Sequence, residues 1–351
     1  MLLTLCIIIL ILYFIQWMKW HQTVPPKLEG YQYIPDCTII IPFRNESEQI
    51  PALLKKLQAH LPDRWRIILV NDHSEDDSLD KIKPHLNLQT QVLQSKGEGK
   101  KIALRTGIEM AHTPWIITMD ADVQLSNDWT SSLYCADWSS DMIIFSLHMP
   151  GSHDFIFKTQ ALEFSIFQYL TAKSCYKGQP QLCNGALLGF KRKAFIEVGG
   201  YERHEEIASG DDQFLMAYFR EKNKRITFHD TQDKVQIEGQ SHWRSLIQQR
   251  MRWAQKSKDM PLHDMKKLGW ITLSANLAAI ALPFLTSGIL AVGLLMMKWV
   301  PEYFAIRPDL RKQFPIITIV FLITYPIWVL IIGVGIVIFP IEWKGRPLNQ
   351  S

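Results

Sequence analysis

The chain has 351 residues, with 38 lysines and arginines against 34 aspartates and glutamates, and a net charge of +4. This length accommodates one sizeable domain with accessory segments. The charge is modest and no basic run is interleaved with aromatic residues, which argues against a nucleic-acid partner. The five cysteines form no Cys-x-x-Cys pair, so they favour a reduced compartment over a disulfide framework.

The N-terminus begins with an almost uncharged apolar run, Leu2 to Trp17, which is followed by Lys19 and Trp20. The run is near the lower limit of length for a membrane span, and the tryptophans beside a lysine are typical of a membrane interface. A signal peptide is the alternative, but it would have a basic start and a small-residue cleavage site. We therefore predict an uncleaved anchor over residues 1–20 and a proline-containing linker over residues 21–36.

Two further apolar stretches, Trp270 to Met297 and Phe314 to Pro340, predict a C-terminal transmembrane region over residues 270–343. The cations between the two stretches are Lys298, Arg307, Arg311 and Lys312. Two simple spans would place these cations opposite a cytosolic middle domain, against the positive-inside tendency. The first stretch could instead bend as a hairpin near Pro283 to Gly288, or lie partly in the interface, and the sequence leaves this open.

The middle of the chain alternates strand and helix. Short β-branched runs predict buried strands over Cys37–Pro42, Arg66–Val70 and Trp115–Met119. Leucine spacing predicts a helix over Glu46–His60, and another helix ends near Gly107–Ala111. This order predicts a doubly wound, mostly parallel sheet, in which ligands bind beyond the carboxyl ends of the strands.

Polar residues follow each predicted strand, and Asp120 and Asp122 follow the third one directly. Two carboxylates one residue apart can face one hard cation, and Mg²⁺ or Mn²⁺ would keep coordination sites for a diphosphate. The same pattern also occurs in turns and helix caps. Asp72, at the tip of the second strand, predicts base or ribose recognition, whereas Asp76 and Asp77 suit a solvated loop that caps the next helix.

A glycine-rich turn with lysines, Gly97 to Lys101, precedes the helix that ends near Ala111. Backbone amides and ammonium groups at such a turn can hold a diphosphate. The turn lacks the P-loop spacing, and a flexible basic loop is the alternative.

Two later segments carry candidate chemistry. Asn184-Gly185-Ala186 permits close backbone approach to a substrate, or tight strand packing. Asp211 and Asp212 come directly before a predicted helix over Gln213–Arg220. One of these carboxylates could deprotonate an acceptor hydroxyl, although a helix N-cap suits them equally well.

The segment Gln249-Arg250-Met251-Arg252-Trp253 lies in a basic amphipathic stretch, which we expect to be an interfacial region over residues 241–269. One interpretation is a helix with arginines at lipid phosphates. The other is a strip of donors and an indole that closes over a diphosphate and an acceptor. Both can hold for different residues.

Taken in order from Ile39 to Trp253, these motifs resemble the family 2 glycosyltransferases, which have a GT-A fold. The matching elements are Ile41–Glu46, Val70–Ser74, Gly99–Leu104, Asp120–Asp122, Gly210–Asp212 and Gln249–Trp253. Asn71, His73 and Arg105 stand where the family usually has Asp, Gly and Asn. The resemblance implies an α/β, Rossmann-like GT-A catalytic domain over residues 37–240, with transmembrane helices at both ends.

The resemblance also implies the roles of individual residues. Asp212 is the implied catalytic base of a single displacement with inversion, and Asp120 and Asp122 are the implied ligands of Mg²⁺ or Mn²⁺. The residues expected at the nucleotide-sugar are Pro42, Arg44, Glu46, Asp72, Lys100, Asp120, Asn184 and Gly185. The residues expected at the diphosphate and acceptor are Asp211, Gln249, Arg252 and Trp253.

The expected function is transfer of a sugar from a nucleotide-sugar, by family habit a UDP-sugar, to a membrane-associated lipid acceptor. A processive polysaccharide synthase is the alternative, because Gln-x-x-Arg-Trp occurs in such enzymes, but a channel normally needs more than two or three spans. A catalytically silent membrane scaffold is the alternative of another class. We expect an integral protein of a bacterial inner membrane, with its catalytic domain facing the cytoplasm.

Overall fold

The computed structural model describes residues 1–26, 33–152, 154–204, 210–255, 260–340, 342–343 and 346–347. The predicted linker residues 27–32, Ser209, residues 256–259 and Lys344-Gly345 lie outside the described residues. The chain divides into two compact units. The sheet unit comprises Pro26–His148 and Gly178–Glu238, and the helical unit comprises Met1–Pro25, Met149–Lys177 and Gly239–Ser351.

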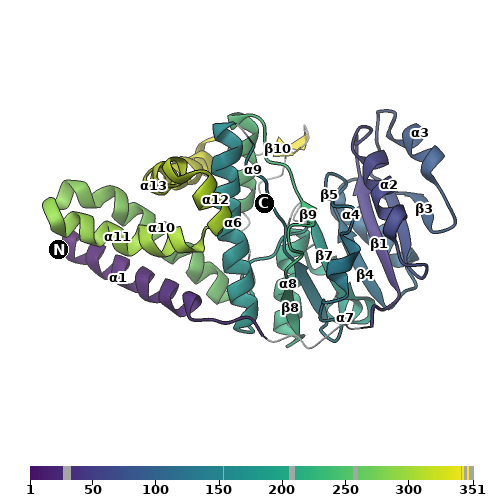
Figure 1. Ribbon diagram of the computed structural model, residues 1–351, viewed down its shortest axis with the longest axis horizontal. Helices are drawn as coiled ribbons and strands as arrows, with labels where there is room; N and C mark the ends of the chain where they lie inside the picture. The colour runs from purple at the N-terminus through teal and green to yellow at the C-terminus, as the bar shows by residue number, and fades with distance from the viewer. Residues whose placement is uncertain are drawn as a thin grey trace. The chain divides into compact units, whose positions relative to one another are not determined.

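A seven-stranded sheet forms the centre of the sheet unit, in the order β3-β2-β1-β4-β7-β6-β8 (Figure 1). Its strands are β1 (Cys37–Phe43), β2 (Arg66–Asn71), β3 (Thr90–Gln94), β4 (Trp115–Met119), β6 (Met142–Phe145), β7 (Leu187–Lys191) and β8 (Ile226–His229). Only β7 runs antiparallel to its neighbours β4 and β6 in this sheet. The predicted mostly parallel α/β sheet is therefore confirmed.

Two central strands of the sheet are buried on both faces, as is typical of parallel sheets. Every residue of β1 and of β4 is buried. Strands buried on both faces need apolar side chains in both alternating directions, and the isoleucines of β1 supply them. Helices connect the parallel strands, so they cover the faces of the sheet.

The helices of the sheet unit are α2 (Ile50–His60), α3 (Ser78–Ile82), α4 (Lys100–Met110), α5 (Thr130–Leu133), α7 (Arg192–Glu197) and α8 (Asp211–Glu221). Short 3-10 helices lie at Lys83–His85 and Glu202–His204, and a small second sheet pairs β5 (Gln124–Leu125) with β9 (Val235–Gln236).

The predicted start of the first helix at Glu46 is wrong, because α2 begins at Ile50. The backbone amides of Asn45 and Glu46 bond instead to the hydroxyls of Ser74 and Ser78, at 3.1 and 2.9 Å. The loop after β1 is thus tied to the loop after β2. Helix formation is delayed until these side-chain bonds end and a proline follows at the helix start.

The helical unit contains α1 (Leu2–His21), α6 (Phe155–Tyr176), α9 (Trp243–Gln255), α10 (His263–Leu285), α11 (Gly288–Ala305), α12 (Pro308–Gln313) and α13 (Pro315–Ile338), with a short hairpin of β10 (Glu342–Trp343) and β11 (Arg346–Pro347). Four of these helices, α1, α10, α11 and α13, are long and apolar enough to cross a membrane. The helices α1, α10 and α11 contact one another (Figure 1).

The first C-terminal apolar stretch is not one helix. It is divided between α10 and α11, with a break at Thr286 and Ser287, and α11 starts at Gly288 in a left-handed conformation with φ of +64°. The structure therefore agrees with the hairpin alternative. It also adds Lys298 and Glu302 to α11, where both side chains are buried.

The unit boundaries differ from a continuous domain over residues 37–240. Contacts group Met149–Lys177, and with it α6, with the apolar helices. The chain thus leaves the sheet unit after β6 and returns to it before β7. A helix of the helical unit therefore lies, in sequence, inside the segment that was expected to be one domain.

Candidate functional site

The carboxyl ends of β1, β2 and β4 lie at one edge of the sheet, because these strands are parallel and adjacent. The antiparallel strand β7 begins at the same edge, where Leu187 pairs with Met119. The amide of Asp120 donates a hydrogen bond of 3.0 Å to the carbonyl of Ala186. Asn184, Gly185 and Asp120 are thereby brought together at this edge.

Lys100 lies among the carboxylates of this edge. Its ammonium is 2.6 Å from Asp120 Oδ1 and 3.4 Å from Asp211 Oδ2. Gly99, with φ of +105°, precedes it and allows α4 to begin at Lys100. Burial alone would lower the pKa of Lys100, but the charges of Asp120, Asp211 and Asp212 raise it above its ordinary value. Lys100 is therefore a permanent cation within an acidic cluster.

Asp212 lies in the first turn of α8, where Gly210 turns the chain with φ of +90°. Its Oδ1 accepts a hydrogen bond of 2.8 Å from the amide of Gln213. A Cβ placed on Gly185 would lie 3.1 Å from the Cβ of Asp212. Glycine therefore keeps the backbone before β7 close to this carboxylate, and Asp212 belongs to the same cluster as Asp120 and Lys100.

Asp120 and Asp122 suit a divalent cation by the chemistry of their donors. Burial raises the pKa of Asp120 and the charge of Asp122 raises it further, while Lys100 opposes this shift. A cation would relieve this crowding of negative charge. No group of three His, Cys, Asp or Glu side chains gathers for a metal within the described part of the chain. Two carboxylates fit Mg²⁺ or Mn²⁺, which share their coordination with substrate phosphates.

Asp72 is almost fully buried at the end of β2. Its carboxylate accepts a hydrogen bond of 2.8 Å from the amide of Gly99 and lies 3.6 Å from Nδ1 of His73. In the structure, Asp72 thus holds the glycine-rich turn that precedes Lys100. The predicted contact with a base or ribose would have to be made from this position.

Of three candidate residues near the end of β1, two lie in the loop that follows it, Arg44 and Glu46. Pro42 is buried within β1, and Arg44 pairs with Glu75 at 3.3 Å. Asn45 has φ of 55°, and its side chain accepts a bond of 2.9 Å from the amide of Glu75. Together with the Glu46–Ser78 bond, these contacts order the loop beside Asp72.

Gln249, Arg252 and Trp253 lie on α9 in the helical unit, and all three are partly exposed. Arg252 and Trp253 are adjacent in sequence, while Gln249 precedes Trp253 by one helical turn. The ring of Trp253 meets Phe167 of α6 edge-on, with centroids 6.3 Å apart. The amphipathic segment predicted from the sequence is a helix.

Comparison with known proteins matches part of the chain to a known family. The family model described as Glycosyl transferase family 2 matches residues 38–199. Residues 38–199 form a family 2 glycosyl transferase domain. The match includes β1, β2, β4 and β7, with Lys100, Asp120 and Gly185, whereas Asp211 and Asp212 follow it in the chain.

Two curated relatives resemble parts of this chain. An undecaprenyl-phosphate 4-deoxy-4-formamido-L-arabinose transferase of Pseudomonas savastanoi pv. phaseolicola is 33% identical over 94 residues, which are 25% of this chain and 28% of that protein. A poly-beta-1,6-N-acetyl-D-glucosamine synthase of Staphylococcus aureus is 25% identical over 248 residues, 68% of this chain and 57% of that protein. The chain thus spans less than two thirds of the length of these relatives.

A solved structure shows the fold. The mannosyltransferase PcManGT from Pyrobaculum calidifontis, in complex with GDP-Man and Mn²⁺, superposes with a TM-score of 0.63 at 17% identity, covering 96% of this chain and 99% of that one. The family 2 transferase domain therefore has the predicted GT-A fold.

Tyr201, in the turn that follows the family 2 domain, was not predicted to belong to the site. Its side chain is buried, and burial together with the charges of Asp211 and Asp212 raises its pKa well above the ordinary value. Its ring packs edge-on against Phe195, with centroids 5.1 Å apart. The sequence carries no signal for this, because only the tertiary fold brings Tyr201 near the carboxylates at the start of α8.

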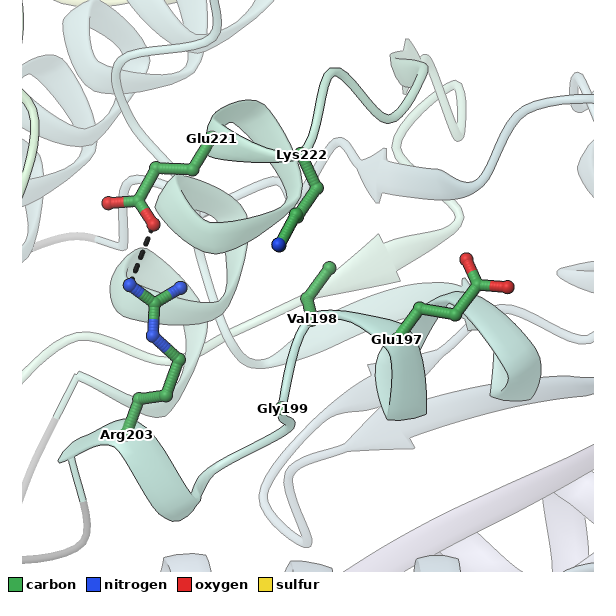
Figure 2. A pocket seen from close by; sticks show the side chains of 6 residues that line it. All are labelled: Glu197, Val198, Gly199, Arg203, Glu221 and Lys222. Atoms are coloured by element: carbon green, nitrogen blue, oxygen red, sulfur yellow. Dashed lines mark ion pairs between the residues drawn. The ribbon is translucent and has the colours of Figure 1, made fainter.

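A surface hollow of about 430 Å³ lies at the opposite end of α8 (Figure 2). It is lined by Glu197, Val198, Gly199, Arg203, Glu221 and Lys222. Arg203 and Glu221 form an ion pair of 2.7 Å across one side of it (Figure 2). Since α8 begins at Asp211 and ends at Glu221, this hollow is separate from the acidic cluster of the transferase site.

Proposed function

We propose that the protein is a metal-dependent, inverting glycosyltransferase that moves a sugar from a nucleotide-sugar to a membrane-associated lipid acceptor. The observation that carries this proposal is the cluster of Lys100, Asp120 and Asp211 beside Asp212 at the carboxyl edge of the sheet. Such a cluster suits glycosyl transfer, because a carboxylate can take up the proton of the acceptor while a cation faces the diphosphate that leaves the sugar.

Asp212 is proposed as the base. The acceptor hydroxyl attacks the anomeric carbon, its proton passes to the carboxylate of Asp212, and the bond to the diphosphate breaks with its electron pair. Lys100 offsets the negative charge that develops on the departing diphosphate. Gly185, which has no side chain, lets the backbone before β7 lie directly against Asp212.

Asp120 and Asp122 are proposed to hold Mg²⁺ or Mn²⁺. When bound, the ion supplies Lewis-acid charge neutralisation at the diphosphate. Their place at the carboxyl end of β4 and their hard oxygen donors favour this pair. Burial raises the pKa of Asp120 and the charge of Asp122 adds to this, although Lys100 opposes it, so a divalent cation would stabilise the ionised pair.

The remaining candidate residues are assigned to binding. We propose that Pro42, Arg44, Glu46, Asp72 and Asn184 form the nucleotide-sugar site, and that Asp211, Gln249, Arg252 and Trp253 act at the diphosphate and acceptor. Arginine provides paired donors for phosphate oxygens, and an indole provides a flat apolar face for a sugar or lipid chain. The fold supports the first group through the ordered loops after β1 and β2.

A lipid acceptor is favoured by the four helices that could cross a membrane and by the resemblance to a transferase named for undecaprenyl phosphate. The predicted donor is a UDP-sugar. Because the structure of PcManGT holds GDP-Man, GDP-sugars belong in the same test. We further propose that the chain resides in a bacterial inner membrane, with the sheet unit facing the cytoplasm.

Processive polysaccharide synthesis is the second candidate. The similarity to the poly-beta-1,6-N-acetyl-D-glucosamine synthase supports it, as does a third C-terminal apolar helix that the sequence pattern did not separate. The two candidates differ in product, because a lipid glycosyltransferase stops after one sugar whereas a synthase extends a polymer.

The test is nucleotide release by detergent-purified protein from a panel of UDP- and GDP-sugars, with Mn²⁺, Mg²⁺ or EDTA, and with or without membrane lipid extract. Metal-dependent release from one donor, increased by lipid and ending at one sugar, is the expected result. A long polymer would select the synthase. If no donor turned over or bound, the proposed enzyme would be wrong and a silent scaffold would take its place.

A further inference from the structure

The helix that carries Gln249, Arg252 and Trp253 is held from two sides within the helical unit. On one side, Met251 packs in an apolar seam with Ile332 of α13, and a Cβ on Gly335 would lie 3.0 Å from the sulfur of Met251. This seam is non-directional, so it holds α9 against α13 without setting the rotation of the polar side chains.

The other side of α9 is held by a buried ion pair. Arg250 Nε donates a hydrogen bond of 2.7 Å to Glu163 Oε2 of α6, and the two side chains are 4% and 6% exposed. The other carboxylate oxygen, Oε1, accepts a hydrogen bond of 3.3 Å from the indole of Trp328 on α13. Glu163 therefore joins three helices at one carboxylate, in a setting where an ionised group is costly unless it is paired.

Arg250 passes this constraint to the neighbouring motif residues. Its guanidinium lies over the ring of Trp253, 4.2 Å from the centroid, and its Nη1 donates to the side-chain oxygen of Gln249. On α6, Phe167 lies one turn beyond Glu163 and meets the same indole. Gln249 and Trp253 thus both contact Arg250, whose guanidinium is held by Glu163.

We propose that Glu163 and Arg250 are positioning residues, which set the orientation of Gln249 and Trp253 for binding of the diphosphate and acceptor. This inference rests on the proposed function for its catalytic consequence, but not for its structural one. Glu163 is the sole acid in the 22-residue helix α6. A buried carboxylate in α6 is not needed to form the helix. It is useful where the side chains of Gln249 and Trp253 must be held in one orientation for binding.

The chain provides a matched control in a second buried ion pair of the same unit. Lys298 on α11 bonds both carboxylate oxygens of Glu302 at 2.8 Å, and Tyr13 of α1 donates to Glu302. Both side chains of the pair are buried and neither lies on α9. Glu302→Gln therefore reproduces the loss of a buried carboxylate without touching the motif.

The experiment compares Glu163→Gln, Arg250→Gln, the double variant and Glu302→Gln in the full chain in detergent. Hydrogen exchange is read over α9 and over α11, and kcat and KM are read with the active donor. We expect backbone amides of α9 to exchange about tenfold faster in Glu163→Gln than in the wild type. In Glu302→Gln, the amides that exchange faster should be those of α11. We also expect kcat to fall about 10- to 100-fold in Glu163→Gln. In Glu302→Gln, kcat should change little even if this variant lowers the thermal unfolding midpoint as much as Glu163→Gln does.

Because the two residues act as one unit, the double variant should lose no more activity than the worse single variant. Unchanged exchange over α9 in Glu163→Gln would overturn the proposal, as would equal losses of kcat in Glu163→Gln and Glu302→Gln. If the wild-type protein turned over no donor, the proposed function would fail, whereas the exchange pattern over α9 would still decide the positioning role.

Discussion

The acidic cluster at the carboxyl edge owes its chemistry to the single cation within it. Lys100 contacts Asp120 and Asp211 directly and is influenced by Asp212. Of these carboxylates, Asp212 is the proposed base by its place in the Gly210–Asp212 motif, and its side chain lies against Gly185. Asp120 is instead committed to Lys100 and to the proposed cation.

Asp212→Asn should abolish transfer while leaving nucleotide binding within a few-fold of the wild type. Asparagine has the same shape but cannot accept the proton, and a positioned base contributes about 10²- to 10⁴-fold in rate. Turnover and calorimetric titration with the nucleotide would measure the two quantities. Asp80→Asn, which removes an exposed carboxylate paired with Lys83, is the control. Turnover near the wild-type rate in Asp212→Asn would refute the assignment of the base.

The sequence patterns singled out Asp120, Asp211, Asp212, Lys100 and Gly185, because each lies in a motif next to the end of a strand or the start of a strand or helix. The structure brings these residues together, and their roles stay predictions. It could not reveal Tyr201, Glu163 or Arg250, which meet their partners only in the folded chain. The signal that the sequence offered for Glu163 was that it is the one acid of α6. This signal does not predict that Glu163 pairs with Arg250. Helix periodicity predicts which face of a helix a residue lies on, but not which residue packs against that face.

At the scale of elements, α4 positions Lys100 through close packing on the sheet. Gly107 lies where a Cβ would be 2.5 Å from the Cγ2 of Ile40 in β1 and 3.1 Å from that of Val70 in β2. Both neighbours are β-branched side chains of central strands, so neither can move aside easily. The helix therefore approaches β1 and β2 as closely as a glycine permits.

Gly107→Ala should lower the free energy of unfolding by about 1–3 kcal/mol, because an extra methyl overpacks this contact. Gly269→Ala is the matched control, since it also replaces a helical glycine but has no atom within 4 Å of the new Cβ. The control should be neutral or stabilising by up to about 1 kcal/mol. Thermal unfolding of both variants in the same detergent would measure the difference. Equal midpoints would contradict the close packing of α4.

Strongly patterned elements were predictable and the rest were not. The strands β1, β2 and β4 appear as β-branched runs, and they were predicted to within one residue of their bounds. The edge strand β3 is partly exposed and mixed in composition, so it gives a weak pattern. The start of α2 was misplaced because the serines that bind its preceding amides lie about 30 residues away.

At the scale of the whole molecule, the division into units follows contacts that the sequence does not display. The segment that contains α6 interrupts the sheet unit and joins the apolar helices. Its sequence is mixed in character, with Glu163 and several polar residues, so hydropathy alone does not assign it to that unit. The break between α10 and α11 was foreseen only as one alternative, and it changes the expected topology.

Four crossings place the cations consistently. If α1, α10, α11 and α13 each span once, six cations fall on the membrane side of the sheet unit. They are Lys19, Lys266, Lys267, Arg307, Arg311 and Lys312. The turn at Thr286 and Ser287 is uncharged and lies on the other side, as does Arg346 after α13. Two simple C-terminal spans would place the cations between α11 and α13 against the positive-inside tendency. Four crossings remove this conflict.

This topology predicts which thiols a membrane-impermeant maleimide reaches in right-side-out vesicles. Cys135 is exposed on the sheet unit and serves as a native marker of its side. The thiol introduced by Ser287→Cys should react in intact vesicles. Cys135 and the thiol introduced by Gln313→Cys should react only after the vesicles are opened. The reason is that α10 crosses the membrane outward and α11 crosses it back to the side of the sheet unit. Labelling of Ser287→Cys only together with Cys135 would show that the α10–α11 turn does not reach the far side, and the cations after α11 would then require another explanation. Reaction of Cys135 in intact vesicles would instead reverse the proposed orientation of the sheet unit.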